Sequence, residues 1–333
     1  MEKCELLKAL LRAHGPSGDE GEIGEIIRRE AETAADEVTV DVMGNLIAHK
    51  KGEGPKVMLA AHMDSVGVIV THIEESGFLR FGALGGLEAK SIAQTAVRFQ
   101  NGVVGVIAVS EDKAEKEFKL SDLYLDIGAE NAAEAKTMVS VGDTAVFCAP
   151  ILENGTRIIA PYLDNRAGCA VLLQAMKAIE HPANDLYFVF TTQEEVGLRG
   201  AKPAAWSLDP DYALVVDVTC PDDVPGALHE GTTAVGKGAA IKVMDHSVIA
   251  HPAVVERLSQ LAAEQGIPVQ RDLLKVGGTD GGVVHVSRAG VLTGGVSIPC
   301  RYTHTPTELI DRRDLDACVR LLQAFCESEL IKP

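Results

Sequence analysis

Two adjacent glutamates, Glu194 and Glu195, follow an apolar run, LYFVF, in the segment TTQEEVGLRG. Neighbouring side chains of an extended chain point to opposite sides, so these two carboxylates should not perform one task together. For an isolated pair, a solvated loop is the simplest explanation, because charged residues mostly lie exposed. The pair becomes a candidate site only if residues of suitable chemistry gather near it.

Histidines and acidic residues also follow the other apolar runs of the chain. In open α/β sheets, ligands bind outside the carboxyl ends of the strands, so these positions are the ones to compare. Each carries a histidine or an acid: His62 and Asp64 after KVMLAA, Asp164 after RIIAPYL, Asp217 after ALVV, and His304 after GVLTGGVSIPCRYT. A single residue of this kind is more simply a helix cap or an ordinary polar side chain. With Glu194 and Glu195, five strand ends carry a histidine or an acid, and this agreement indicates a divalent metal site.

The number of these residues favours two metal ions over one. A single catalytic zinc uses three protein ligands and keeps one position open. Two histidines and three carboxylates suit a pair of ions about 3.5–4 Å apart that share a bridging carboxylate and a water. Three carboxylates and one hydroxide balance four positive charges, so one glutamate of the adjacent pair is free. That glutamate can act as a general base, a role that contributes about 10²–10⁴ in rate.

Composition sets broad limits on the protein. At 333 residues, the chain can form one large domain or two. No apolar run approaches the length of a membrane span, the N-terminal segment is charged from Glu2, and seven cysteines occur without a CxxC motif. We therefore expect a cytoplasmic protein without a signal peptide, a disulfide framework or a structural zinc cluster. The net charge of −17 argues against nucleic acid or an anionic membrane as a partner.

Helices and strands are expected to alternate over most of the chain. Apolar periodicity predicts helices over residues 5–12 and 19–35, with Ser17 or Asp19 as the cap of the second, and further helices over 165–180, near Val254 and near Leu315. The runs LYFVFTT and ALVVDVT are typical of strands buried on both faces of a mainly parallel sheet. The predicted fold class is α/β, with a mixed, mainly parallel sheet sandwiched by helices.

A block of different texture interrupts this pattern. Between Gly67 and Gly155, short β-rich runs alternate with glycines and with the charged stretch EDKAEKEFK. This texture indicates a small inserted barrel-like β domain. We predict a catalytic α/β domain from residues 1–66 and 156–333 and an inserted domain from residues 67–155.

Six motifs, in their order along the chain, resemble those of the tetrahedral (TET) metallo-aminopeptidases: AHMDSVG, YLDNRAGC, TTQEEVGLRGA, VVDVT, VGGTDGG and YTHTPTE. This is the glutamyl and deblocking aminopeptidase type, some members of which were formerly labelled endoglucanases. The resemblance covers nearly the whole chain, including the β insert. One position departs from the common pattern, since Ser65 stands where the family often has a glutamate.

The resemblance implies a role for each candidate residue. It makes Asp164 the bridge between the ions, with His62 and Asp217 completing one metal site and Glu195 and His304 the other. It makes Glu194 the catalytic base, which takes a proton from the metal-bound water. It makes Asp64 the residue that orients the first histidine.

The resemblance also implies an activity and an assembly. The activity is removal of N-terminal residues from short peptides with a free N-terminus, in which metal-bound hydroxide attacks and Glu194 passes the proton to the leaving amine. The cofactors are two divalent ions per subunit, with zinc expected and cobalt or manganese as alternatives. The assembly is a homo-oligomer, a tetrahedral dodecamer built from dimers, with contacts supplied by the insert.

The sequence is compatible with three other functions. A deacylase or carboxypeptidase of a related dinuclear family usually carries its insert after the EE motif, whereas this insert lies between His62 and Asp164. A glycoside hydrolase could use a carboxylate pair but would leave both histidines unexplained. An inactive metal-stabilised scaffold has no need of a base.

Several further motifs have simpler explanations. The glycine-rich GGTDGG lacks the Lys-Ser/Thr of a phosphate loop, so we expect Thr279 or Asp280 to cap a helix. Cys220 has no evident base partner and is expected to be an inert thiol. Arg199 and Arg301 could bind a substrate carboxylate or form ordinary ion pairs. The histidines outside the motifs are expected to be ordinary ones: His72, His181, His246, His251 and His285.

Overall fold

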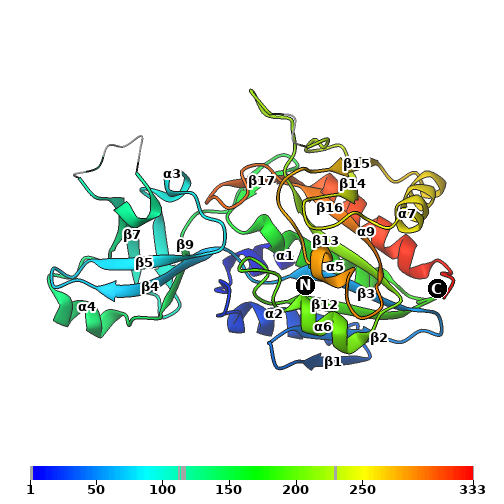
Figure 1. Ribbon diagram of the computed structural model, residues 1–333, viewed down its shortest axis with the longest axis horizontal. Helices are drawn as coiled ribbons and strands as arrows, with labels where there is room; N and C mark the ends of the chain where they lie inside the picture. Colours follow the sequence, from blue (N-terminus) through cyan, green and yellow to red (C-terminus); the bar gives the residue numbers. More distant parts are fainter. Residues whose placement is uncertain (1–2, 112, 114–117, 229–230, 333) are drawn as a thin grey trace.

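The computed structural model describes residues 3–111, 113, 118–228 and 231–332 (Figure 1). Within these residues, eight strands form a mixed sheet at the centre of the larger part of the molecule. Their spatial order is β1 (Glu37–Val40), β2 (Leu46–Lys50), β12 (Asp185–Thr191), β3 (Lys56–His62), β13 (Tyr212–Thr219), β16 (Leu292–Pro299), β14 (Ala239–Met244) and β15 (Val269–Leu273).

The four central strands, β12, β3, β13 and β16, are mutually parallel. They are also the most apolar, and their residues are almost all buried, as expected for strands covered on both faces. Antiparallel pairing brings β2 to β12 on one side and β14 to β16 on the other. Since the central strands are parallel, their carboxyl ends meet at one edge of the sheet.

Helices cover both faces of the sheet. One face packs against α1 (Lys3–Arg12), α2 (Gly21–Ala31), α5 (Leu163–Ala178), α7 (Pro252–Gln265) and α9 (Arg312–Glu327). The other face packs against α6 (Ala201–Leu208) and α8 (Gly281–Val284) through a smaller apolar cluster that includes Met58, Ala204 and Val284. The predicted α/β sandwich is confirmed. None of the described helices combines the length and the apolar character needed to cross a bilayer.

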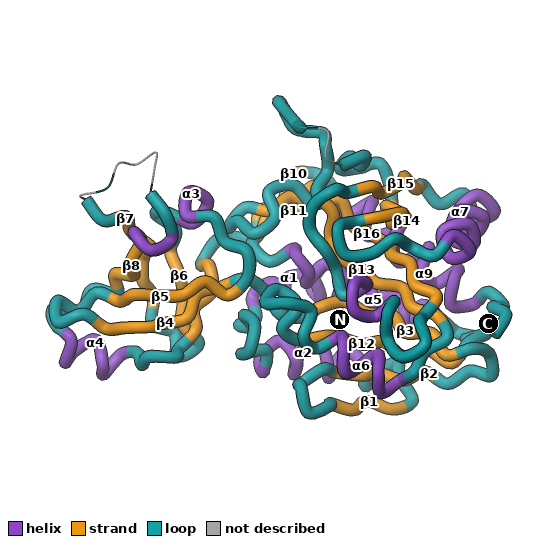
Figure 2. The backbone as a smooth tube through the Cα atoms, viewed as in Figure 1, coloured by secondary structure: helices purple, strands orange, loops and turns teal. Residues whose placement is uncertain are grey.

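A closed β-barrel projects from the sandwich, as Figure 2 shows. Its strands are β4 (Gly67–Ile73), β5 (Leu79–Leu84), β8 (Leu123–Asp126), β7 (Val104–Val109), β6 (Ala96–Phe99) and β9 (Thr144–Phe147), in the order in which they pair. Short helices connect them: α3 (Ala89–Ile92), η1 (Leu120–Asp122) and α4 (Ala132–Met138). The predicted barrel-like insert is confirmed, whereas the division at residues 67 and 155 stays a prediction. Most of the charged stretch EDKAEKEFK lies outside the described residues.

Two expectations about local structure are wrong. Helix α2 starts after Glu20 without a side-chain cap, because Ser17 and Asp19 bond elsewhere: Ser17 donates to Asp64 and Asp19 accepts from Thr144. The run RIIAPYL contributes β11 (Arg157–Ala160), which pairs with β10 (Leu152–Asn154) and β17 (Glu308–Asp311) in a separate antiparallel sheet. Asp164 is therefore presented by the start of α5 and not by a strand of the main sheet.

Gly200 allows α6 to start close beneath the loop that carries the two glutamates. A Cβ atom there would lie 2.3 Å from Asn45 Oδ1 and 2.5 Å from the backbone oxygen of Thr192. Gly21, at the start of α2, has no heavy atom within 4 Å of the corresponding position.

We expect Gly200→Ala to lower the free energy of unfolding by roughly 1–3 kcal/mol, because backbone must move to admit the methyl group. The matched change Gly21→Ala should be neutral or stabilise by up to ~1 kcal/mol. Thermal or denaturant unfolding measures both. Equal effects of the two changes would show that the close approach at Gly200 is not a constraint.

Candidate metal centre

The parallel strands bring three of the predicted positions to one edge of the sheet. His62 is the last residue of β3, where it pairs with Thr191, the last residue of β12. Glu194 and Glu195 follow Thr191 after a short turn. Asp217 lies within β13, two residues before its end, and its backbone is level with His62 because Val215 pairs with Ala60.

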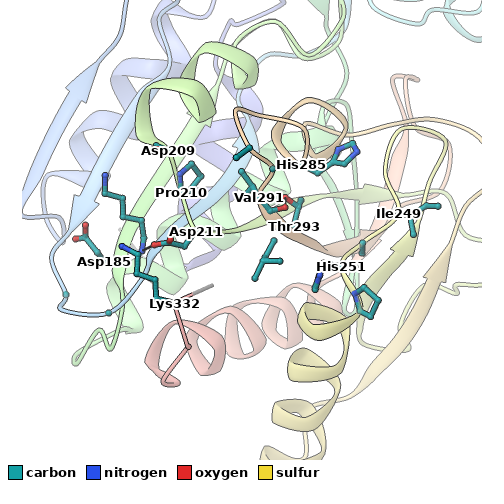
Figure 3. Close-up of a pocket in the computed structure, with 18 of the residues that line it drawn as sticks. Asp185, Asp209, Pro210, Asp211, Ile249, His251, His285, Val291, Thr293 and Lys332 are labelled. Atoms are coloured by element: carbon teal, nitrogen blue, oxygen red, sulfur yellow. Dashed lines mark hydrogen bonds between the residues drawn. The ribbon is translucent and has the colours of Figure 1, made fainter.

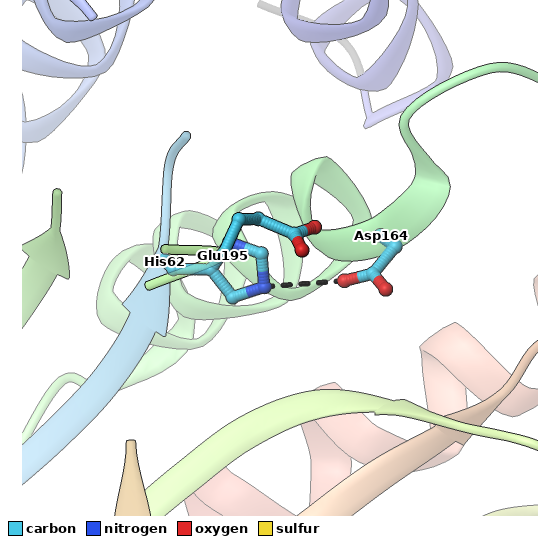
Figure 4. A group of neighbouring side chains, drawn as sticks. All are labelled: His62, Asp164 and Glu195. Atoms are coloured by element: carbon cyan, nitrogen blue, oxygen red, sulfur yellow. Dashed lines mark hydrogen bonds and ion pairs between the residues drawn. The ribbon is translucent and has the colours of Figure 1, made fainter. Parts of the chain in front are cut away.

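Asp164 lies between the two histidines of the predicted set. Its Oδ1 atom is 3.1 Å from His62 Nε2, and its Oδ2 atom is 3.4 Å from His304 Nε2. Figure 4 shows the carboxylate turned toward His62, with Glu195 beside them. The two oxygens of one carboxylate thus face two different imidazoles.

The remaining candidates surround these three residues. Asp217 Oδ1 is 3.6 Å and Glu194 Oε2 is 3.9 Å from His62 Nε2, and Glu195 Oε2 is 3.2 Å from His304 Nε2. Among the described residues, two groups offer ligand atoms within 4.8 Å of one another: His62, Asp164 and Glu195, and His62, Glu194 and Asp217. The five predicted ligands and the predicted base therefore converge, although proximity alone does not separate the base from the ligands.

Both histidines are oriented by backbone carbonyls. His62 Nδ1 is 3.1 Å from the oxygen of Asp64, and His304 Nδ1 is 2.9 Å from the oxygen of Gly86. These bonds leave each Nε2 atom facing the carboxylates, which is the arrangement usual for histidines that bind metals. His304 has a φ of 62°, a value that few residues other than glycine adopt, so the surrounding bonds hold its backbone in place.

The Asp64 carboxylate holds the loop of the two glutamates. It accepts hydrogen bonds from the backbone N–H groups of Glu194 and Glu195, at 3.0 and 3.3 Å, and from the hydroxyl of Ser17, at 2.6 Å. Its nearest oxygen is 3.6 Å from His62 Nδ1, which is beyond a hydrogen bond. Asp64 thus contacts the histidine mainly through its backbone and the glutamates through its side chain.

Two buried acids of the site were missed as functional residues. Glu308 accepts hydrogen bonds from the backbone N–H groups of Asp164, at 2.9 Å, and His304, at 2.8 Å, so it joins two candidate ligands. Its place in YTHTPTE, four residues after His304, is the signal that could have found it. Thr279 or Asp280 was expected to cap a helix. Thr279 Oγ1 accepts from the N–H of Gly281, the first residue of α8, at 3.3 Å, whereas the Asp280 side chain accepts from the hydroxyl of Thr191, at 2.6 Å, and burial raises the pKa of Asp280 to about 7.

Added positive charge would stabilise the buried carboxylates of this cluster. Burial raises the pKa values of Glu194, Glu195 and Asp217, since their charged forms lose contact with water. Burial opposes protonation of His304, yet Asp164 and Glu195 raise its pKa to about 12. The buried Oε1 atom of Glu195 has no hydrogen-bond partner. Oxygen and imidazole donors in this number and closeness fit divalent cations.

The barrel insert also reaches the cluster. Gly85 and Gly86 follow β5, and a Cβ atom on either would lie 3.1 Å from a polar atom of the site, Glu195 Oε2 or His304 Nδ1. Gly85 in addition has a φ of +85°. Side chains at these two positions would crowd Glu195 and His304, so glycine keeps this side of the site open.

The cluster lines a pocket of about 400 Å³. A larger pocket, of about 1060 Å³, lies at the opposite end of the strands, near Lys56, Asp185, Asp211 and Leu292 (Figure 3). Neither group of potential metal ligands includes a residue of the larger pocket. The smaller pocket is therefore the candidate active site.

The other sequence candidates take ordinary roles. Arg301 forms a two-pronged ion pair with Asp223, both bonds 2.7 Å long, and Arg199 bonds Gln193. Ser65 is buried and donates to the oxygen of Gly15, away from the cluster. Cys220 lines the pocket, but burial raises the pKa of its thiol, which disfavours a nucleophile.

The remaining histidines behave as expected where the structure shows bonds for them. His251 caps α7 by accepting from the N–H of Ala253, and His285 bonds the backbone oxygen of Gly281. Within the described part of the chain, neither potential ligand group includes these two, or His72, His181 and His246.

Comparison with known proteins gives the family of the chain. Residues 44–321 match the family described as M42 glutamyl aminopeptidase. The chain belongs to this family. A relative from Acetivibrio thermocellus is 46% identical over 97% of this chain and 98% of its own length. The match favours the aminopeptidase over the glycoside hydrolase and the inactive scaffold, and the protein is an enzyme that hydrolyses peptide bonds.

Solved structures of the M42 fold resemble the whole chain. An aminopeptidase from the archaeon Desulfurococcus kamchatkensis superposes with a TM-score of 0.94, at 38% identity, over 98% of this chain and 94% of its own. The Pyrococcus horikoshii TET1 peptidase, which assembles into a tetrahedron or an octahedral shell, superposes with a TM-score of 0.88, at 32% identity, over 98% and 99%. The resemblance to TET aminopeptidases inferred from the motifs is confirmed.

Glu308 should matter for metal binding although it is not a predicted ligand. We expect Glu308→Ala to weaken zinc affinity by about 10–100-fold, the usual cost of removing a residue that orients ligands. Glu308→Gln, which keeps one acceptor oxygen, should lose less, and the surface change Glu264→Ala on α7 should have no effect. Competition with a chromogenic chelator measures the affinities. Wild-type affinity of Glu308→Ala would contradict the positioning role.

Proposed function

We propose that this M42 aminopeptidase removes N-terminal residues from short peptides at a dinuclear metal site. Asp164 would contribute to both ions, His62 and Asp217 would complete one site, and Glu195 and His304 would complete the other. The observation that supports this assignment best is the placement of Asp164, whose two oxygens face His62 and His304 separately. Asp217 is 3.6 Å from Nε2 of His62, and Glu195 is 3.2 Å from Nε2 of His304.

The ions are proposed to be zinc, with cobalt or manganese able to substitute. When bound, such ions polarise the scissile carbonyl and lower the pKa of water enough to supply a nucleophile near neutral pH. The chain supplies the ligands and their orientation: Asp64 and Gly86 hold the imidazoles through backbone oxygens, and Glu308 holds Asp164 and His304 together.

Glu194 is the proposed general base. Its carboxylate is 3.9 Å from His62 Nε2, which is farther than the carboxylates of Asp164 and Asp217. Burial raises the pKa of Glu194, and a more basic carboxylate is better suited to accept a proton. Glu194 would take the proton from the attacking water and pass it to the leaving amine, and Asp64 fixes the backbone from which it acts.

The two adjacent glutamates should respond differently to isosteric change. We expect Glu194→Gln to retain both metals and to lower kcat by about 10²–10⁴ with little change in KM, because an amide cannot accept the proton. Glu195→Gln should lose metal, and excess zinc in the assay should restore part of its activity. Metal analysis and aminoacyl-anilide kinetics measure both. Rescue of Glu194→Gln by excess zinc would reverse the two assignments.

We also propose that the chain forms a homo-oligomer, a tetrahedral dodecamer. The tetrahedral and octahedral assemblies of the Pyrococcus horikoshii TET1 peptidase support this proposal. The barrel of this chain exposes apolar side chains suited to contacts between subunits, since Val104 and Val141 are 58% and 60% exposed.

Light scattering should give a particle mass twelve times the 35.3 kDa of one chain. Replacing both Val104 and Val141 by Asp should yield smaller particles that keep their metal, because charges oppose burial of the barrel surface. A monomeric wild-type chain would refute the assembly.

A further inference from the structure

The loop between α1 and α2, residues 13–20, contacts the turn that carries the two glutamates. The Oε1 atom of Glu20 accepts a hydrogen bond from the backbone N–H of Gln193, at 3.2 Å. The same oxygen accepts a second bond, from the N–H of Gly18, at 2.8 Å. Glu20 therefore joins its own loop to the residue that directly precedes Glu194.

Three successive backbone N–H groups of the turn after β12 donate to carboxylates. Gln193 donates to Glu20, whereas Glu194 and Glu195 donate to the two oxygens of Asp64. Since Glu20 precedes α2 and Asp64 follows β3, two separate segments of the chain hold the turn. Hydrogen bonds to charged acceptors are stronger than those between neutral groups, so these bonds fix the course of the backbone.

Gln193 is the residue at which the chain turns from β12 toward the pocket. Its φ of 54° lies in the left-handed region, which few residues other than glycine adopt. Its carbonyl oxygen accepts from the N–H of Arg199, at 3.2 Å. The bonds to Glu20 and Arg199 thus hold both backbone polar groups of Gln193 in a conformation that persists only with such support.

The loop that presents Glu20 is itself fixed. Ser65 accepts from the N–H of Ser17, and Gly15 accepts from the N–H of Ser65, both at 3.1 Å, so the loop pairs with the chain beyond β3 as a short strand would. The fully buried Arg166 donates to the oxygen of Gly15, at 2.9 Å. Glu20 therefore acts from a rigid support.

Glu20 faces a different cavity from the metal cluster. It lines a space of about 250 Å³ together with Met63 and Thr192, whereas Glu194 and Glu195 line the pocket of about 400 Å³. The hydrogen bond to the backbone before Glu194 is the direct route by which Glu20 can act on the reaction.

We propose that Glu20 is a positioning residue for the general base: by holding Gln193, it sets the direction of the Glu194 side chain. This inference rests on the proposed function, in which Glu195 is a metal ligand and Glu194 is not. Glu195 would be held by its metal as well as by its backbone, whereas Glu194 depends on the backbone alone. Removal of Glu20 should therefore impair the base and spare the binding of metal and substrate.

The test measures kcat, KM and zinc content of Glu20 variants with an aminoacyl-anilide substrate. We expect Glu20→Ala to lower kcat about 10-fold with KM and zinc content unchanged, because a small misplacement of a reacting group is costly. Glu20→Gln keeps an acceptor oxygen for both N–H groups and should retain most of kcat. Glu20→Asp keeps the charge but not the reach and should resemble the alanine variant. The exposed Glu22 on α2 is the matched control, and Glu22→Ala should have wild-type kcat.

A double-mutant cycle separates positioning from a general structural role. If Glu20 acts through Glu194, Glu20→Ala should cause no further loss of kcat in a Glu194→Gln background, since no base is left to position. An equal fold loss in both backgrounds, loss of zinc, or wild-type kcat of Glu20→Ala beside an impaired Glu194→Gln would overturn the inference. Where the alanine variant fails to fold, Glu20→Asp supplies the same cycle. Wild-type kcat of Glu194→Gln would instead refute the proposed base itself, and the inference with it.

Discussion

Mutual repulsion among buried carboxylates is the constraint on which this structure depends. Asp164, Glu194, Glu195 and Asp217 gather around two imidazoles in a pocket that removes them from water. Burial acts to raise the pKa of all four acids, and the net shift is upward for Glu194, Glu195 and Asp217. The histidines lower the pKa of Asp164, which they flank. Such a cluster is unfavourable without added cations, and two divalent ions offset it best if Asp164 serves both.

The scaffold meets this constraint with acids that hold backbone N–H groups. Asp64 accepts from the two glutamates of the turn after β12, and Glu308 accepts from Asp164 and His304. Each of these carboxylates ties together chain segments that are more than a hundred residues apart. The parallel strands bring the segments to one edge of the sheet, and the two buried acids then set the positions of the side chains.

The sequence predicts the parts of this arrangement that rest on local patterns. Apolar runs such as LYFVFTT mark the central strands, and repeated acids and histidines after the runs mark the pocket, because strand ends are encoded next to the residues they present. The bonds of Ser17, Asp64 and Glu308 could not be predicted, since each depends on a partner brought near only by tertiary packing. For the same reason, nothing local showed that β11 leaves the main sheet.

The bridging role of Asp164 is the central claim, and anomalous diffraction tests it most directly. Crystals grown with zinc would be measured on both sides of the zinc absorption edge. The account predicts two anomalous peaks about 3.5–4 Å apart, one beside His62 and Asp217 and one beside Glu195 and His304, with the Asp164 carboxylate between them. A single peak, or two peaks of which only one lies within bonding distance of Asp164, would contradict it.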